Sequence, residues 1–110
     1  MVSGADDIRQ AVGIILGTNP GERVMRPDFG AGLRALVFEP LNTTTIEQVK
    51  ERVRTALVRW EPRIDVLAVR VTADQPFANK LLIEIDYQIR ASNTFDNLVY
   101  PFYLLERGGP

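Results

Sequence analysis

The chain has 110 residues, of which 45% are hydrophobic, and its 13 Lys and Arg against 14 Asp and Glu give a formal net charge of −1. This size suits a single domain spanning residues 1–110 with a modest core, and the near-zero charge provides no field that would attract nucleic acid or an anionic membrane. Because the sequence contains no cysteine and no histidine, it excludes disulfides, thiol chemistry and the usual zinc sites, and we expect no metal and no cofactor.

The N-terminal segment "MVSGADDIRQAVGIILGT" predicts a helix of about three turns rather than a signal peptide or a membrane anchor. Ser3 and Asp6 resemble an N-cap and its acidic N3 residue, and the helix should end near Gly17. Acidic residues precede the apolar stretch, which is too short to span a bilayer, so we expect a protein made and used in a cytoplasm. The apolar positions at helical spacing are Ile8, Val12, Ile15 and Leu16.

Two breaks follow this helix. Thr18–Gly21 has the composition of a turn, and a short strand or hairpin is expected at Glu22–Met25. The second break is Pro27–Gly32, after which the apolar segment Leu33–Phe38 predicts a brief helix.

A long amphipathic helix is predicted next. Thr44 as N-cap and Glu47 three residues later form a capping box. The helix should end at about Trp60, because Pro62 disfavours the helical conformation at Glu61. One face carries Ile46, Val49, Val53, Ala56, Leu57 and Trp60. We therefore expect the Trp60 indole to be a core anchor at a helix-to-strand corner.

Beyond this helix the hydrophobic period changes to two, which predicts strands. The strands are "RIDVLAVRVTAD" and "KLLIEIDYQIRAS", joined by a loop at Gln75–Asn79, and then "NLVYPFYLLE". Pro101 lacks an amide donor, so it belongs on an edge strand or at a bulge. The order of elements indicates an α+β fold, with helices packed on one face of a small, mostly antiparallel sheet and the other face and the edges left available.

Glu61 and Arg63 stand out, because neither the helical nor the strand period requires a charge there. A corner between elements is usually exposed, so one interpretation is a solvated turn or a weak ion pair. The alternative is a rigid recognition point, at which Pro62 fixes the backbone and the planar guanidinium of Arg63 binds a partner's carboxylate or main chain by two hydrogen bonds.

Four segments in this order and spacing resemble one known family: "GERVMRPDFGAGLRALVFEP", "WEPRI", "LLIEIDYQI" and "SNTFDNLVYPFYL". The sequence is similar to the baseplate wedge family of contractile phage tails and related contractile injection systems. This family includes the wedge component of type VI secretion baseplates and carries a lysozyme-like label. The resemblance extends from about Ile8 to Leu105, nearly the whole chain.

The resemblance implies a structural role in a phage tail or injection particle, assembled in the cytoplasm of a bacterial or archaeal host. Family members bind the core bundle of the larger wedge subunits, resemble the handshake domain of the sheath protein, and initiate the sheath. Their baseplates are sixfold, which implies about six copies per particle. Glu61, Pro62 and Arg63 match the family's wedge-contacting motif, Glu-Pro-Arg.

A sheath contact by strand addition also has a physical basis, because a sheet edge offers unpaired amides and carbonyls to a partner's extended arm. The edge is expected along the last strand, with Asn97, Val99, Pro101 and Tyr103 as contacts and Pro101 limiting uncontrolled pairing. The sequence does not determine which strand is the edge. The alternative is that the aromatic and aliphatic residues of this strand belong to the core, namely Leu98, Tyr100 and Phe102.

The lysozyme-like label implies a rival function, a peptidoglycan-cleaving enzyme. Glycoside hydrolysis ordinarily requires two carboxyl groups placed across the scissile bond. Candidate carboxylates are Glu39 and Glu61, which each precede a proline, and Asp28 in a glycine-rich loop, but nothing in their spacing pairs them. We therefore expect no enzymatic activity.

A small binding module is the other alternative. The segment that contains Gly30 and Gly32 lacks the lysine and the hydroxyl residue of a phosphate-binding loop. We therefore interpret both residues as turn glycines. Arg52, Arg54 and Arg59 lie on one predicted helix, but interleaved glutamates favour a solvated helix face over a nucleic-acid site.

Overall fold

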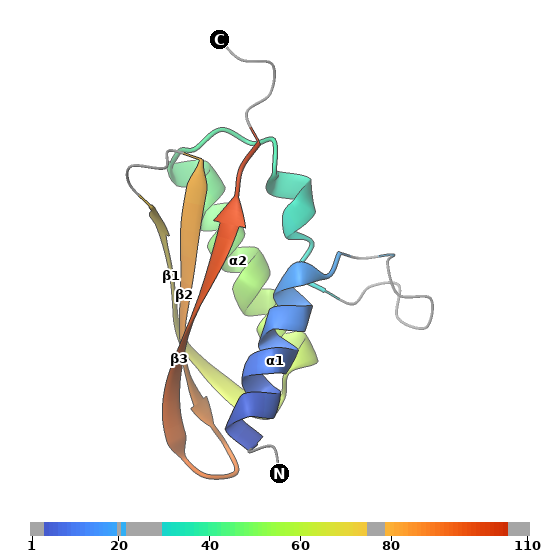
Figure 1. Cartoon of the computed structure of the whole chain (residues 1–110), viewed down its shortest axis with the longest axis vertical. Helices are drawn as coiled ribbons and strands as arrows, with labels where there is room; N and C mark the ends of the chain where they lie inside the picture. Colours follow the sequence, from blue (N-terminus) through green and yellow to red (C-terminus); the bar gives the residue numbers. More distant parts are fainter. Residues whose placement is uncertain (1–3, 20, 22–29, 75–78, 106–110) are drawn as a thin grey trace.

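The structure, a computed structural model, describes residues 4–19, 21, 30–74 and 79–105. In chain order the elements are α1 (Gly4–Gly17), the 3₁₀ helix η1 (Leu33–Leu36), α2 (Thr43–Trp60), β1 (Ile64–Ala73), β2 (Lys80–Ile89) and β3 (Thr94–Tyr103) (Figure 1). The strand or hairpin expected at Glu22–Met25 lies outside the described residues. No described helix combines the length and apolarity needed to cross a membrane.

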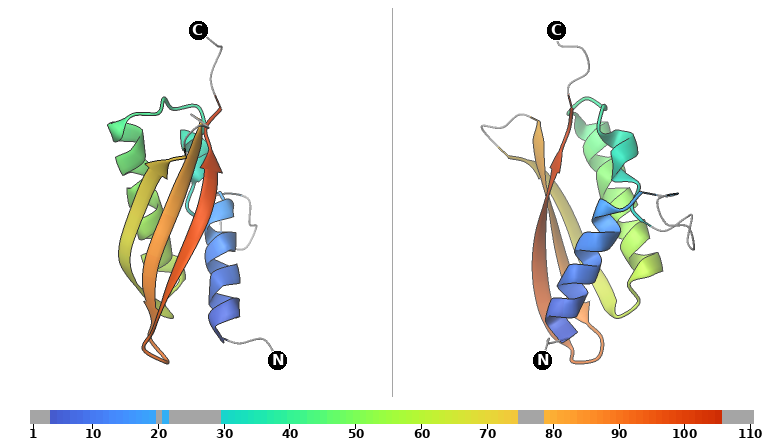
Figure 2. Two further views of the ribbon diagram at one scale, coloured as in Figure 1. Left: turned by 60° about the vertical axis from the view of Figure 1, so that its left-hand side comes forward. Right: turned by 45° about the vertical axis from the view of Figure 1, so that its right-hand side comes forward.

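The strands form an antiparallel sheet in the order β1-β2-β3, so β2 is central and β1 and β3 are the edge strands of the described sheet. Both α-helices lie on one face of the sheet (Figures 1 and 2), and the left view of Figure 2 shows α2 behind β1 and α1 beside β3. The opposite face is turned away from both helices (Figure 2, left). The predicted α+β class, with helices on one face of an antiparallel sheet, is confirmed.

Burial of apolar side chains holds the two layers together. On β2, Leu81, Ile83, Ile85 and Tyr87 are fully buried against the helices, and they alternate with partly exposed residues as the period of two predicts. Each buried aliphatic side chain contributes roughly 1.5–3 kcal/mol. The helices contribute the positions expected from their spacing: Ile8, Val12, Ile15, Leu16, Val49, Val53, Ala56 and Leu57.

The two edge strands depart from regular pairing in different ways. In β1 the register shifts between Val66 and Ala68, which leaves Leu67 as an extra, exposed residue. β3 begins at Thr94, ahead of its predicted start, because the ladder with β2 extends toward the hairpin. Pro101 keeps the register with β2, so its place on an edge strand is confirmed and the bulge alternative is wrong.

The start of α2 corrects the predicted capping box. Asn42, not Thr44, is the N-cap, and its Oδ1 accepts a hydrogen bond from the Thr45 amide at 2.9 Å. Glu47 pairs instead with Lys50 at 3.3 Å. Asparagine is among the strongest N-cap residues. With Asn42 as the cap, the helix begins at Thr43 and Thr44 lies inside its first turn.

The glycines of the second break have conformations that only glycine adopts easily. Gly30 and Gly32 have φ angles of 114° and 68°. A Cβ added at Gly30 would also lie 2.3 Å from the carbonyl oxygen of Thr18. These glycines shape the turn that leads into η1. The presence of η1 confirms the brief helix predicted at Leu33–Phe38, although the observed helix is shorter.

Candidate functional site

The corner between α2 and β1 buries a carboxylate that we expected to be exposed. The Glu61 amide donates to the Leu57 carbonyl at 2.9 Å and closes the last turn of α2. Pro62 follows, and the chain turns into β1. Glu61 is only 3% exposed, so the prediction of a solvated Glu61 is wrong.

Arg63 folds back onto this buried carboxylate. Its Nε and Nη2 donate to the two Glu61 oxygens, each at 2.8 Å, and its amide donates to Oε1 at 3.3 Å. These hydrogen bonds from Arg63 lower the pKa of Glu61 against the opposing effect of burial. The bidentate geometry proposed for a partner is therefore occupied within the chain.

Arg63 nevertheless presents part of its guanidinium to solvent. Its side chain is 50% exposed, and its Nη1 makes no hydrogen bond to any described residue. The buried Glu61 thus fixes the position of a half-exposed cation at the corner. A partner carboxylate could bind Nη1 without displacing Glu61.

An apolar hollow of about 420 Å³ lies beside this cation. Ile14 on α1 is 45% exposed although its side chain is large and apolar. The lining residues come from α1 and the corner: Ala11, Ile14, Ile15, Trp60, Glu61, Pro62 and Arg63. We call this hollow the corner groove. It combines an apolar wall with the exposed end of an arginine whose charge is paired with Glu61.

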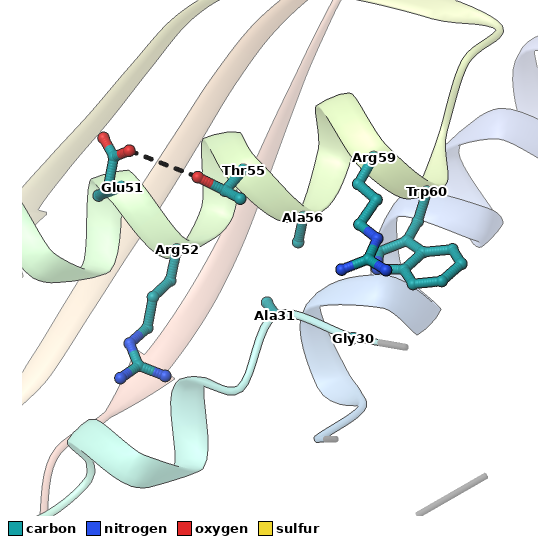
Figure 3. Close-up of a pocket in the computed structure, with 8 residues that line it drawn as sticks. All are labelled: Gly30, Ala31, Glu51, Arg52, Thr55, Ala56, Arg59 and Trp60. Atoms are coloured by element: carbon teal, nitrogen blue, oxygen red, sulfur yellow. Dashed lines mark hydrogen bonds between the residues drawn. The ribbon is translucent and has the colours of Figure 1, made fainter. Parts of the chain in front are cut away.

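Trp60 packs against the core as expected, but its indole is not fully buried. The indole packs against the core but remains partly exposed, because it forms a wall of the corner groove and of a second hollow of about 200 Å³. In this second hollow the Arg59 guanidinium lies 4.7 Å from the centre of the indole ring (Figure 3). Trp60 therefore separates two surface depressions at the end of α2.

The predicted contacts on β3 lie on the exposed side of the strand. Asn97, Val99, Pro101 and Tyr103 all have exposed side chains. Their neighbours in the strand face the helices: Phe102 is buried, and Leu98 and Tyr100 pack against the core. Leu98, Tyr100 and Phe102 therefore belong to the core, as the alternative interpretation expected. The four predicted contact residues do not.

One hydrogen bond shows which main-chain amides and carbonyls of β3 point toward β2 and which point away from it. The Leu104 amide donates to the Asn79 carbonyl at 2.7 Å, next to the start of β2. In an antiparallel ladder, residues alternate between bonding the neighbour and pointing away from it. The main-chain groups of Asn97, Val99, Pro101 and Tyr103 therefore point away from β2, toward the open edge.

The corner and the β3 edge form two separate candidate sites. Arg63 leads directly into β1, and β3 is the opposite edge of the sheet. The structure does not bring the two predicted groups of residues together. A partner at each site could bind independently.

Sequence reasoning missed a polar cluster that joins α1 to the sheet. Arg9 Nη1 lies 3.1 Å from Asp96 Oδ1, and Tyr87 Oη donates to Asp96 Oδ2 at 2.9 Å. Burial, aided by the hydrogen bond to Asp96, raises the pKa of Tyr87 to about 12. A signal was present, because Asp96 places a charge at a position that shares the inward register of Leu98 and Tyr100.

The residues considered for the rival functions are occupied in other ways or fall outside the structure. Asp28 lies outside the described residues, Glu39 is exposed, and Arg63 holds the Glu61 carboxylate. Arg52 donates to the Gly32 carbonyl at 3.0 Å. Within the described ranges, no group of three acidic residues gathers as a metal site would require.

Comparison with known proteins gives one consistent result. Residues 2–94 match the model of a protein family described as baseplate wedge protein gp25. Baseplate protein W of Escherichia phage P2 is 31% identical over 87 residues, which cover 79% of this chain and 74% of that protein. Baseplate wedge protein gp25 of Enterobacteria phage T4 is 35% identical over 68 residues, covering 62% of this chain and about half, 52%, of that protein.

Solved structures agree with this fold. A crystal structure from Geobacter sulfurreducens, provisionally named a tail lysozyme, is 49% identical, covers 96% of each chain and superposes with a TM-score of 0.89. A chain of the postcontracted pyocin R2 baseplate is 32% identical, with a TM-score of 0.62 over 93% of this chain and 87% of that one. A chain of the anti-feeding prophage baseplate shares the fold at 20% identity, with a TM-score of 0.66 over 97% of this chain and 74% of that one.

Proposed function

The chain belongs to the baseplate wedge protein gp25 family, and from that premise we propose that it joins the larger wedge subunits of a contractile particle to the first sheath ring. In this proposal residues 1–110 act as one structural domain without enzymatic activity. The domain assembles in the host cytoplasm and is present in about six copies per sixfold baseplate.

The corner groove is the proposed contact with the wedge core bundle. The observation that carries this assignment is the apolar groove beside an arginine whose position is fixed by a buried carboxylate. A helical partner could insert an apolar side chain between Ile14 and Trp60 and place a carboxylate on Arg63. Because Glu61 holds the guanidinium in place before binding, little side-chain entropy is lost on contact.

The β3 edge is the proposed contact with the sheath. Its outward main-chain groups can complete a ladder with an extended arm of the sheath protein. Such an arm would add a strand next to β3, on the side opposite β2.

The absence of hydrolase activity is also part of this proposal. A glycosidase acid must remain protonated near neutral pH, usually because an apolar setting raises its pKa. Glu61 is the buried candidate, but its hydrogen bonds to Arg63 lower its pKa and keep it ionised.

Incorporation into particles tests the wedge contact. We would sediment sheath-containing particles from the native host and measure this protein in the pellet for the wild type and for Ile14→Glu. The glutamate places a charge in the apolar groove but leaves the Glu61–Arg63 pair intact. We expect the wild type to sediment at a small fraction of the sheath copy number, and Ile14→Glu to remain soluble.

Val58→Glu is the matched control. Val58 is 66% exposed on α2 and does not line the corner groove, so this variant should sediment like the wild type. If Ile14→Glu is incorporated normally, the groove is not the wedge contact. If the wild type is absent from every particle, the baseplate role itself is wrong.

A further inference from the structure

One residue of the open β3 edge is already paired within the chain. The Asn97 amide donates to Asp96 Oδ1 at 2.8 Å, and the Asn97 carbonyl accepts a hydrogen bond from Arg9 Nη1 at 2.8 Å. These are the two outward main-chain groups of Asn97. The Arg9–Asp96 ion pair therefore supplies the donor and the acceptor that a neighbouring strand would supply at this position.

The ion pair is anchored on the core and is not a loose surface contact. The same Arg9 nitrogen lies 3.1 and 3.2 Å from the two Asp96 oxygens. Asp96 also accepts a hydrogen bond from Tyr87, whose side chain is fully buried. An acceptor with three donors in fixed positions holds its geometry better than an exposed pair of long side chains does.

The other end of the edge is closed by a second internal contact. The Leu105 amide, which also points outward, donates to the Val37 carbonyl at 2.7 Å. Between the two closed ends, the outward groups of Val99, Pro101 and Tyr103 make no hydrogen bond to any described residue. We call Val99–Tyr103 the open window.

The open window borders a hollow of about 310 Å³ between β3 and the helices. Val37 and Tyr100 contribute partly exposed apolar surface to this hollow, and Asn19 and Arg34 contribute polar groups. Side chains of an added strand alternate between the two faces of the sheet. One face of an incoming segment would therefore meet this mixed apolar and polar surface.

We infer that the Arg9–Asp96 pair is a strand stop, which limits an extended segment of a partner protein to the open window and so sets its register on β3. This inference rests on the proposed sheath contact and specifies where that contact ends. Pro101 adds to the register, because its outward carbonyl can accept a hydrogen bond from an added strand but it has no amide to donate. The occupant is an extended arm of the sheath protein, with one face of the arm directed at the hollow.

Amide hydrogen exchange on the full chain tests the stop, first without a partner. By NMR we expect slow exchange of the Asn97 and Leu105 amides and fast exchange of the Val99 and Tyr103 amides. In Arg9→Gln, Asp96 loses a donor that holds it against the Asn97 amide, so this amide should exchange about fivefold faster, the factor that corresponds to one net hydrogen bond. Arg9 is 41% exposed, so this variant should remain folded.

The second arm adds the purified sheath protein of the same particle. In the wild type, protection should increase at Val99 and Tyr103 and remain unchanged at Asn97. In Arg9→Gln, the protected region should extend through Asn97 to Phe95. Arg90→Gln is the matched control, because it removes an exposed ion pair with Asp65 on the β1 side and should leave the protected region as in the wild type.

The outcomes separate the stop from the sheath contact. Protection that runs past Asn97 in the wild type, or an unchanged protected region in Arg9→Gln, would overturn the stop and leave the sheath contact standing. Protection absent from the whole of β3 would overturn the sheath contact and the stop together. Fast exchange of Asn97 in the isolated wild type would overturn the stop alone.

Discussion

Glu61 and Arg63 combine two properties that usually exclude each other in a surface ion pair. The carboxylate is buried, so water does not stabilise its charge, whereas the guanidinium is half exposed. A buried charge is tolerated when its hydrogen bonds are satisfied, and the three contacts from Arg63 satisfy Glu61. The pair therefore both stabilises the corner and directs Arg63 outward.

The stability of the corner should depend on this pair. We expect Arg63→Gln to lower the free energy of unfolding at pH 7 by about 1–3 kcal/mol, because it leaves a buried carboxylate without its charged partner. The double variant Glu61→Gln with Arg63→Gln should recover most of this loss, since no buried charge remains. Urea unfolding of the three proteins measures both differences, and equal losses in the two variants would contradict this explanation.

The pH dependence has a definite sign. Because folding lowers the pKa of Glu61, its ionised form contributes stability above the pKa of an unfolded glutamate, about 4.3. This contribution is lost as the pH falls through the lower folded pKa. The stability difference between the wild type and Arg63→Gln should therefore be full at pH 7 and shrink in acid. A difference that stays constant down to pH 3 would rule out Glu61 as its source.

The sequence predicted where the Glu-Pro-Arg motif lies in the fold, but not how its side chains are arranged. The sequence placed Glu61, Pro62 and Arg63 at a helix-to-strand corner, because Pro62 ends the helical conformation before it. It could not show that Glu61 turns inward, since this depends on the space left between α1 and the corner. The contribution of Ile14 to the groove was hidden for the same reason, because Ile14 lies on α1, far from the motif in sequence.

At the scale of elements, most of the fold could be predicted from hydrophobic periodicity. The change from a helical period in α2 to a period of two in β1 and β2 predicted the element types and the buried residues. Element ends were less predictable, because they depend on which of several capable side chains takes a capping role. Asn42 and Thr44 are both good N-cap residues, and only the structure distinguishes them.

The observed cap gives a simple comparison. Asn42→Ala should lower the free energy of unfolding by about 1 kcal/mol, because the Thr45 amide loses the acceptor it has in the structure. Thr44→Ala should change it by less than about 0.5 kcal/mol, since no cap depends on Thr44. Thermal unfolding of the two variants tests the assignment, and the reverse order of effects would restore the predicted capping box.

At the scale of the whole molecule, the described sheet has two edges that are protected in different ways. β1 carries the extra residue Leu67, and such bulges twist an edge away from regular pairing. β3 combines Pro101 with the internal pairing of Asn97 and Leu105. Sequence alone left open which strand is the edge, because the order of strands in a sheet depends on contacts between distant segments. The structure leaves β3 with a short, bounded window, whereas β1 is interrupted near its middle.

The protection by Pro101 can be tested through self-association of the isolated protein. Pro101→Val restores an outward amide in the open window, so two β3 edges could pair with more hydrogen bonds than before. With one net hydrogen bond gained per chain, the association constant should rise about 5- to 30-fold. Sedimentation velocity over a range of concentrations measures this change. Thr94→Val is the control, because it adds a valine to the same strand at a position whose main chain faces β2. If Pro101→Val associates no more than this control, the missing donor does not keep the edge from pairing, and the closed ends at Asn97 and Leu105 must account for that protection.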